Sequence, residues 1–256
     1  MAERLQFTVR NVMDSLTMAA ASGMRSRLES LDMLANNLAN ASAPGFKADR
    51  EFYNLYVSAD AQDGSDQPAT TSPLIESKWT DFNQGTLTPT SNPLDVAING
   101  KGFFAVTSPQ GTLFTRDGSF KLSVQGELQT QEGYAVQDPQ GKPIVLDPSQ
   151  QTDIGTDGTV RQNGVVVGQI NLVDFSNPQA LAKQGQNYFF ADNGNTPAPA
   201  GAAEVQQGNL ESANFQTAES AVRLITVMRQ FESLQKAMSV GTDMNKKAVE
   251  EVARVD

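Results

Sequence analysis

The chain of 256 residues contains no cysteine and no histidine, and 29 acidic residues outweigh 19 basic ones for a net charge of −10. These absences exclude Cys/His zinc sites, iron–sulfur ligation, disulfides, thiol nucleophiles and histidine general bases. An acidic chain also lacks the cations that displace counterions from nucleic acid, so nucleic acid is not an expected partner. Catalysis by carboxylates, lysine or tyrosine stays open, but no residue group singles out a site. We therefore predict no catalytic, cofactor-binding or metal residues, and no enzyme activity.

The N-terminal segment, residues 1–57, is predicted to be mainly helical from Met13 to Asn40. Apolar residues recur there at spacings of three and four, which places them on one stripe. Pro44 and Gly45 end the helix, because a residue before proline leaves the α region and glycine tolerates positive φ. Residues 1–12 have neither the apolar run nor the cleavage site of a secretory signal, so no cleavable signal is expected there. They are either an extension before the predicted helix or the result of a misassigned start. The stripe consists of Met13, Leu16, Ala20, Met24, Leu28, Leu31, Leu34, Leu38 and Ala41.

Three asparagines, Asn36, Asn37 and Asn40, follow one another in the last turn of this helix. Asparagine tolerates the left-handed conformation at helix ends, which gives one explanation. An amide on a helical seam can instead fix the register between subunits. The sequence alone leaves both explanations open.

The middle of the chain changes to a period of two. Residues 58–72 are small, polar and proline-bearing, which predicts a linker, and residues 73–205 are predicted to form an all-β domain. Asn-Gly and Asp-Gly pairs between the apolar runs favour hairpins. A second soft stretch, residues 191–203, looks like another linker. The strands are expected within residues 94–98, 103–106, 111–118, 126–129, 164–173 and 188–190.

The C-terminal segment, residues 206–256, predicts a long helix whose N-terminus Asn214 or Thr217 could cap. Its apolar positions alternate three and four residues apart, which is a heptad pattern. We expect this helix to pair with the N-terminal one as a coiled-coil stalk. The fold class is therefore mixed: an all-β central domain flanked by long terminal helices. The heptad seam contains Leu224, Val227, Phe231, Leu234 and Met238, continuing through Gly241, Asn245, Ala248 and Val252.

Two motifs that are associated with ligand binding have simpler structural explanations in this sequence. Residues 100–105 fit G-x-G-x-x-A, but a strand-like Phe-Phe follows where a dinucleotide site needs a helix N-terminus, so a tight hairpin turn is expected. Asp147, Asp153 and Asp157 do not have the offsets of a calcium loop, so we expect them to cap turns.

Four segments resemble the bacterial flagellar rod and hook axial proteins. Residues 34–47 (LANNLANASAPGFK) are similar to the N-terminal signature of that family, and residues 92–104 and 114–120 to the start of its central β domain. Residues 208–215 (GNLESANF) resemble the entry into its C-terminal helix. Together they cover most of the chain from Met13 onward. Residues 229–238 and the compact middle look most similar to the proximal rod protein, with the distal rod protein next.

This resemblance implies a structural subunit of the flagellar basal-body rod, which polymerises through its terminal helices and transmits torque from motor to hook. It further implies a periplasmic location, export through the type III apparatus without a cleavable signal, and contacts with its own copies and other axial proteins. The alternative hypothesis is an exported binding or carbohydrate-active β domain on a helical oligomerisation stalk. The residues expected to serve assembly are Leu31, Leu34, Asn36, Asn37, Leu38, Asn40, Pro44, Gly45, Phe46, Leu224, Val227, Phe231, Leu234 and Met238.

Overall fold

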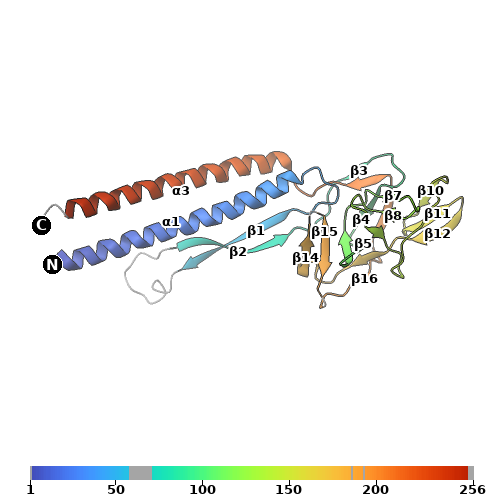
Figure 1. Ribbon diagram of the computed structural model, residues 1–256, viewed down its shortest axis with the longest axis horizontal. Helices are drawn as coiled ribbons and strands as arrows, with labels where there is room; N and C mark the ends of the chain where they lie inside the picture. The colour runs from blue at the N-terminus through green and yellow to red at the C-terminus, as the bar shows by residue number, and fades with distance from the viewer. Residues whose placement is uncertain (1, 58–70, 186, 193, 253–256) are drawn as a thin grey trace. The chain divides into compact units, whose positions relative to one another are not determined.

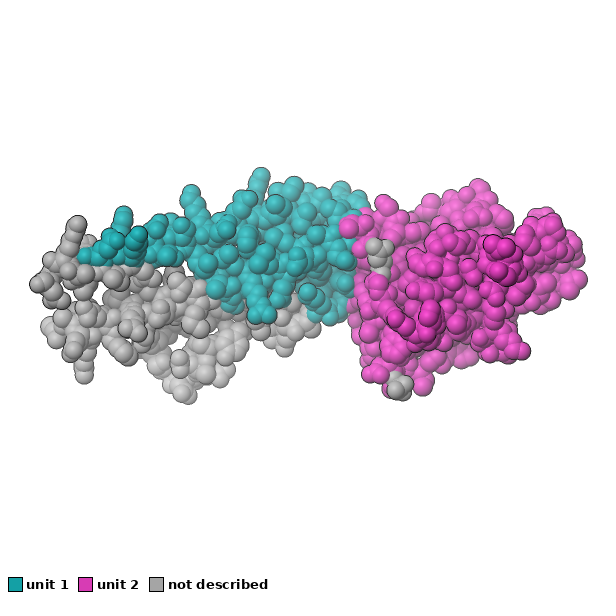
Figure 2. Space-filling view, viewed as in Figure 1, with its two compact units in different colours: residues 1–38, 49–79, 216–256 teal, residues 39–48, 80–215 magenta. Residues whose placement is uncertain are grey.

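The computed structural model describes residues 2–57, 71–185, 187–192 and 194–252. Within it the chain forms two compact units, shown in different colours in Figure 2. Unit 1 combines residues 1–38, 49–79 and 216–256, and unit 2 combines residues 39–48 and 80–215. Two long helices flank a β-rich middle, which confirms the coarse fold prediction.

Unit 1 contains helix α1 (Ala2–Ala39), helix α3 (Thr217–Val252) and the hairpin of β1 (Asp49–Val57) and β2 (Thr71–Thr80) (Figure 1). Helix α1 begins at Ala2, so residues 2–12 of the expected extension are helical. The reason is that neither glycine nor proline interrupts the chain before Gly23. None of the helices in the described ranges is long and apolar enough to cross a bilayer.

The predicted stripe on α1 is only partly right. Leu34 is buried, but Leu28 is 46% exposed. Small residues take its place on the buried side of the helix, and a Cβ atom added to Gly23 would lie 3.6 Å from Cδ1 of Leu234 in α3. Close approach at this point requires small side chains, which a search for large apolar residues overlooks. The buried positions in the described part of α1 are Gly23, Ser26, Ser30, Met33, Leu34 and Asn37.

On α3 the heptad positions are the less exposed ones. Val227 is buried, whereas Leu224, Phe231, Leu234 and Met238 are half-buried. Apolar side chains on other sides of the helix are 46–66% exposed. The described structure therefore turns the predicted seam inward and leaves other apolar side chains of α3 in solvent. These exposed apolar side chains are Val222, Ile225, Met228, Val240 and Met244.

The β1–β2 hairpin was not predicted, since residues 1–57 were expected to contribute helix and extension. Glu51 interrupts the apolar alternation in β1, yet its side chain is buried, so hydropathy alone misses the strand. The expected linker over residues 58–72 lies outside the described residues except for Thr71 and Ser72, which begin β2.

Unit 2 contains short strands in several sheets. The first part of unit 2 contains β3 (Leu87–Pro89), β4 (Val96–Asn99), β5 (Phe103–Ser108), β6 (Gly111–Thr115), β7 (Lys121–Leu122), β8 (Leu128–Gln129) and β9 (Ala135–Val136). The second contains β10 (Thr152–Ile154), β11 (Thr159–Gln162), β12 (Val165–Gln169), β13 (Leu172–Asp174), the 3₁₀ turn η1 (Pro178–Ala180), β14 (Leu181–Gln184), β15 (Tyr188–Ala191), β16 (Ala198–Pro199), β17 (Glu204–Gln207) and β18 (Asn209–Glu211).

The strands of unit 2 pair into sheets of different size. In the described part of the unit, nine strands form the largest sheet, whose main path runs β14-β15-β6-β5-β9-β8-β7, with β13 and β16 joined beside β5. The expected single strand over residues 164–173 is two strands, β12 and β13, in different sheets.

The largest sheet is covered by a hydrophobic cluster on each face. Successive side chains of a strand point to opposite faces, so Phe104 and Val106 of β5 join one cluster, while Phe103 and Ala105 join the other. The second cluster is rich in aromatic contacts, such as Phe103 against Phe189 with ring centroids 5.7 Å apart. Both faces of β5 are therefore buried, which explains its continuous apolar run.

The compact units cut the chain at other places than the four predicted segments. Strand β17 pairs with β4, and β18 pairs with β3, so residues 204–211 lie inside unit 2. The stretch 191–203, expected to be a linker, contributes β16 to the pairing with β13. The boundaries of the units follow from strand pairing between distant segments, which cannot be predicted from amino-acid composition.

Candidate assembly surface and buried ion cluster

The predicted assembly residues fall into both units. Leu31, Leu34 and Leu38 lie on α1 in unit 1, together with the seam of α3. In contrast, residues 40–46 lie in unit 2. The predicted set is therefore divided between the two units.

The asparagines differ from one another. The side chain of Asn37 is buried and bonds within the chain, because its Nδ2 donates to the carbonyl of Asp49 at 2.8 Å and its Oδ1 accepts from the Asp49 amide at 3.0 Å. Asn36 is exposed on α1, and Asn40 is buried in the turn that follows the helix. The amide of Asn37 thus fixes the start of β1 against α1.

A buried carboxylate joins three elements of unit 1. The hydroxyl of Ser30 on α1 donates to Oε2 of Glu51 at 2.6 Å. Arg223 on α3 donates to Oε1 of the same carboxylate at 2.7 Å. Glu51 therefore ties the hairpin to both helices, a role that the sequence analysis missed.

The turn after α1 is shaped by Gly45. Its φ is +68°, and a Cβ atom there would overlap the backbone of Arg116 and Asp117, so only glycine fits. The Gly45 amide donates to the carbonyl of Glu211 at 2.7 Å. The next residue, Phe46, is buried and packs edge-on against Phe215. The Pro44–Phe46 turn is thus built into unit 2.

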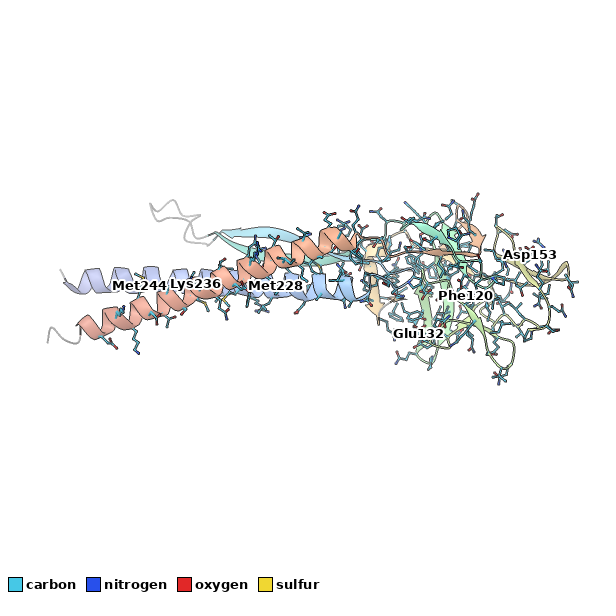
Figure 3. The ribbon with its side chains drawn as sticks, turned by 90° about the horizontal axis from the view of Figure 1, so that it is seen from above. Phe120, Glu132, Asp153, Met228, Lys236 and Met244 are labelled. Carbon is cyan, nitrogen blue, oxygen red and sulfur yellow. The ribbon has the colours of Figure 1, made fainter. Side chains whose placement is uncertain are left out.

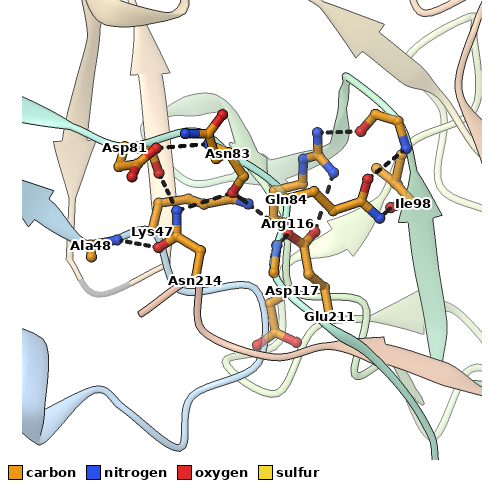
Figure 4. A network of polar contacts seen from close by, with 12 residues as sticks. Lys47, Ala48, Asp81, Asn83, Gln84, Ile98, Arg116, Asp117, Glu211 and Asn214 are labelled. Atoms are coloured by element: carbon orange, nitrogen blue, oxygen red, sulfur yellow. Dashed lines mark hydrogen bonds and ion pairs between the residues drawn. The ribbon is translucent and has the colours of Figure 1, made fainter. Parts of the chain in front are cut away.

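Beside this turn lies a buried ion cluster (Figure 4). Nζ of Lys47 donates to Oε1 of Glu211 at 2.6 Å, and NH1 of Arg116 donates to Oε2 at 3.2 Å. The side chains of Lys47 and Glu211 are 0% exposed and that of Arg116 is 4% exposed. The Gly85 amide also donates to Oε1 of Glu211, at 2.7 Å. One carboxylate is therefore the ion-pair partner of two buried cations.

The backbone completes the coordination of the two cations. Lys47 also donates to the carbonyl of Asn83 at 2.8 Å, and NH2 of Arg116 donates to the carbonyl of Gly100 at 2.8 Å. Burial lowers the pKa of Lys47 and of Arg116, and the Glu211 carboxylate opposes this shift in both. Glu211 is the carboxylate that both cations contact, and the charges of Asp81 and Asp174 add weaker attraction for Lys47 and Arg116 respectively.

Asn214 extends the same network and does not cap α3, which begins at Thr217. Its Nδ2 donates to the carbonyls of Asp81 and Asn83, and its Oδ1 accepts from the Ala48 amide at 2.8 Å. Figure 4 shows this amide between Ala48 on one side and Asp81 and Asn83 on the other. The hydrogen bonds of Asn214 therefore connect segments that are distant in sequence, and the pattern of a helix N-terminus could not predict them.

The sequence contained a signal for this cluster. Lys47, Arg116 and Glu211 each stand among glycines and apolar residues in the segments that resemble the family, but they were not singled out. Since ionic residues are rarely buried without a partner, charges of opposite sign in such surroundings could have suggested a pair. Their partnership across up to 164 positions needed the fold.

The other chemical motifs are structural turns. Gly100 and Gly102 adopt φ of +104° and +142°, but β4 and β5 belong to different sheets, so this turn is not the expected hairpin. Asp147 and Asp157 accept bonds from the amides of Ser149 and Thr159, which confirms turn capping by these two. No group of three potential metal-ligating side chains occurs among the described residues.

Asp117, next to the cluster, gives a test of pH dependence. Burial raises its pKa, although Ser119 donates to the carboxylate. A raised folded-state pKa gives stability that is complete below the ordinary value and is lost as pH rises through the raised one. Compared with wild type, Asp117→Asn should therefore gain stability as pH rises through the acid range. Urea unfolding at a series of pH values measures this difference.

Asp147→Asn is the matched control, because hydrogen bonds from Ser149 lower the pKa of this exposed carboxyl. Its contribution is present above the ordinary value and is lost as pH falls through the lowered one. The difference from wild type should then have the opposite slope. The same slope for both variants would contradict the assignment of Asp117.

Comparison with known proteins assigns the chain to a family. Residues 19–47 match the family described as flagella basal body rod protein, residues 97–162 the flagellar hook protein FlgE/F/G D1 domain, and residues 206–251 the flagellar basal body rod FlgEFG protein C-terminal region. The flagellar basal-body rod protein FlgF of Caulobacter vibrioides is 32% identical over 95% of this chain and 100% of its own length. The chain belongs to the flagellar basal-body rod proteins.

Further relatives of this rod protein carry two names. FlgF of Mesorhizobium japonicum is 34% identical over 88% of this chain and 92% of its own. FlgG of Borreliella burgdorferi is 33% identical over 88% of this chain and 94% of its own. This membership makes the protein a structural part of the flagellar basal body, and favours that function over the carbohydrate-active alternative.

The ion cluster draws one member from each family region of this rod protein. Lys47 ends the N-terminal match, Arg116 lies in the central match and Glu211 lies in the C-terminal match. The cluster is therefore the place where the three regions meet within unit 2.

Proposed function

We propose that the chain polymerises through its terminal helices within the rod, pairs them as a coiled-coil stalk, and carries torque from motor to hook without catalysing a reaction. The observation that carries this proposal is the set of five apolar side chains left exposed on α3. Met228 and Met244 project from that helix along its length (Figure 3). Soluble monomers rarely expose long apolar surfaces, and such surfaces mark sites of association.

The energy of this contact depends on repetition. Complete burial of one large apolar side chain contributes about 1.5–3 kcal/mol. Burial of the five exposed apolar side chains of α3 would therefore stabilise each contact between subunits substantially. The inward seam adds a second requirement, because α3 must keep its position against α1. In a polymer, every subunit repeats both the burial of the exposed side chains of α3 and the packing of α3 against α1.

Gly241 provides space for a neighbour. Among the described residues, no atom lies within 4 Å of a Cβ placed on it, apart from its own surroundings along the helix. A glycine in a helix interior costs about 1 kcal/mol relative to alanine, which a packing role would offset. We propose that a side chain of an adjacent subunit fills this space.

The position within the basal body follows from the same proposal. We assign the chain to the periplasmic rod, in contact with its own copies and other rod and hook proteins, after type III export without a cleaved signal. The proximal position is preferred over the distal one because of residues 229–238 and the compact middle. The family names of the relatives support the rod assignment.

Limited proteolysis tests assembly through the termini. In the dilute isolated protein, protease should remove α1 and α3 and leave a core that contains residues 40–48 and 80–215 of unit 2, identified by mass. This core extends beyond residue 205 because Val205 and Glu211 lie in the interior of unit 2. In purified basal bodies the same helices should resist cleavage. Equal resistance of the helices in the isolated and assembled states would contradict the proposal.

A further inference from the structure

The interior of unit 2 is completed by a segment near its C-terminal end. Strand β17 pairs with β4 along Val96–Asn99, and β18 pairs with β3 along Leu87–Pro89. Val205 of β17 is 0% exposed and belongs to the larger hydrophobic cluster. Without this segment, β3 and β4 would lose their paired strands and the cluster would be open to water.

Polar side chains of the same segment satisfy backbone groups from distant parts of the chain. Nε2 of Gln207 donates to the carbonyls of Pro93 and Thr152, at 2.7 and 2.9 Å, and its Oε1 accepts from the Ile154 amide at 3.2 Å. Asn214 does the same for Ala48, Asp81 and Asn83. Four of these partners are buried residues, namely Ala48, Asp81, Thr152 and Ile154. Because buried backbone groups that lack partners cost free energy, their segments depend on the late arrival of residues 207 and 214.

The charge balance imposes a stricter condition. Lys47 and Arg116 are buried in the folded unit, and both donate to the carboxylate of Glu211. A chain in which residue 211 has not yet appeared would have to bury both cations without this partner. Because an uncompensated buried charge is strongly destabilising, the native arrangement of residues 47 and 116 is inaccessible to that chain.

We infer that residues 204–214 act as a closing segment, with Glu211 as its key residue, and that unit 2 stays unfolded until this segment has emerged. A chain that leaves the ribosome or a narrow channel N-terminus first then keeps its β-rich middle unfolded until 214 of its 256 residues have passed. Arrival of the closing segment forms the β17–β4 and β18–β3 strand pairs, completes the larger hydrophobic cluster and forms the ion pairs of Glu211 in one step. This inference concerns folding order and does not depend on the polymerisation proposed above.

Stalled nascent chains provide the test. The full coding sequence is translated to successive lengths before an arrest peptide, whose release reports the pulling force of folding. Chains that expose residues only up to 203 should show background release. Release should rise several-fold at lengths at which Asn214 has left the ribosomal tunnel. A rise of the same size in chains that expose no residue beyond 203 would overturn the inference.

Two variants at the longer length isolate the carboxylate. Glu211→Gln should reduce release to the background of the shorter chains, since Lys47 and Arg116 lose their ionised partner. Glu204→Gln makes the same change on an exposed side chain in the same segment, and should keep the wild-type release. Wild-type release from Glu211→Gln would show that the ion cluster does not control closure, and would overturn the role of Glu211.

Discussion

Glu211→Gln should lower the free energy of unfolding of unit 2 by about 3–5 kcal/mol, because removal of one partner leaves buried charges uncompensated. The neutral amide keeps the shape of the side chain, so the loss reports charge and not packing volume. Both Lys47 and Arg116 donate to this carboxylate. Hydrogen exchange of peptides from β5 and β6, combined with urea unfolding, measures the effect in the correct unit.

Two further variants distinguish charge imbalance from general damage. Adding Lys47→Met to Glu211→Gln removes one of the stranded cations, so the double variant should be more stable than Glu211→Gln alone. Glu204→Gln, at an exposed position, should change stability by no more than about 0.5 kcal/mol. If Lys47→Met instead adds a full loss of its own, the ion cluster does not act as one unit.

Phe231→Glu should abolish motility and rod assembly while unit 2 remains folded. Phe231 is a half-buried seam residue of α3, so a glutamate there places a charge where the helix packs. Loss of the phenyl group also removes about 1.5–3 kcal/mol of apolar burial from every repeated contact. Swimming in soft agar and electron microscopy of isolated basal bodies measure the outcome.

The matched control for this variant is Gln235→Glu, which introduces the same charge one turn later at an exposed position outside the seam. It should leave motility close to wild type. Hydrogen exchange of unit 2 checks that neither change unfolds the β strands. Normal rods built from Phe231→Glu subunits would remove the seam from the assembly mechanism.

Local patterns in the sequence were sufficient to predict several elements of the fold. The heptad spacing placed Leu224, Val227 and Phe231 on the less exposed side of α3, as observed. Short apolar runs bounded by turn residues located β5, β6 and β15. Pro44 and Gly45 marked the end of α1, because their backbone restrictions act within one or two residues. The family resemblance likewise came from short ordered motifs.

Contacts between segments that are distant in sequence could be identified only from the three-dimensional structure. Glu51 escaped detection because a charged residue breaks a strand pattern, and its burial depends on Ser30 and Arg223 on separate helices. Gly23 faces Leu234 because close helix approach favours small side chains, which carry no apolar signal. Glu211 is neutralised across up to 164 positions by partners that no local pattern links. Local periodicity reports which face of an element is buried, whereas pairing of charges and strands is set by three-dimensional proximity.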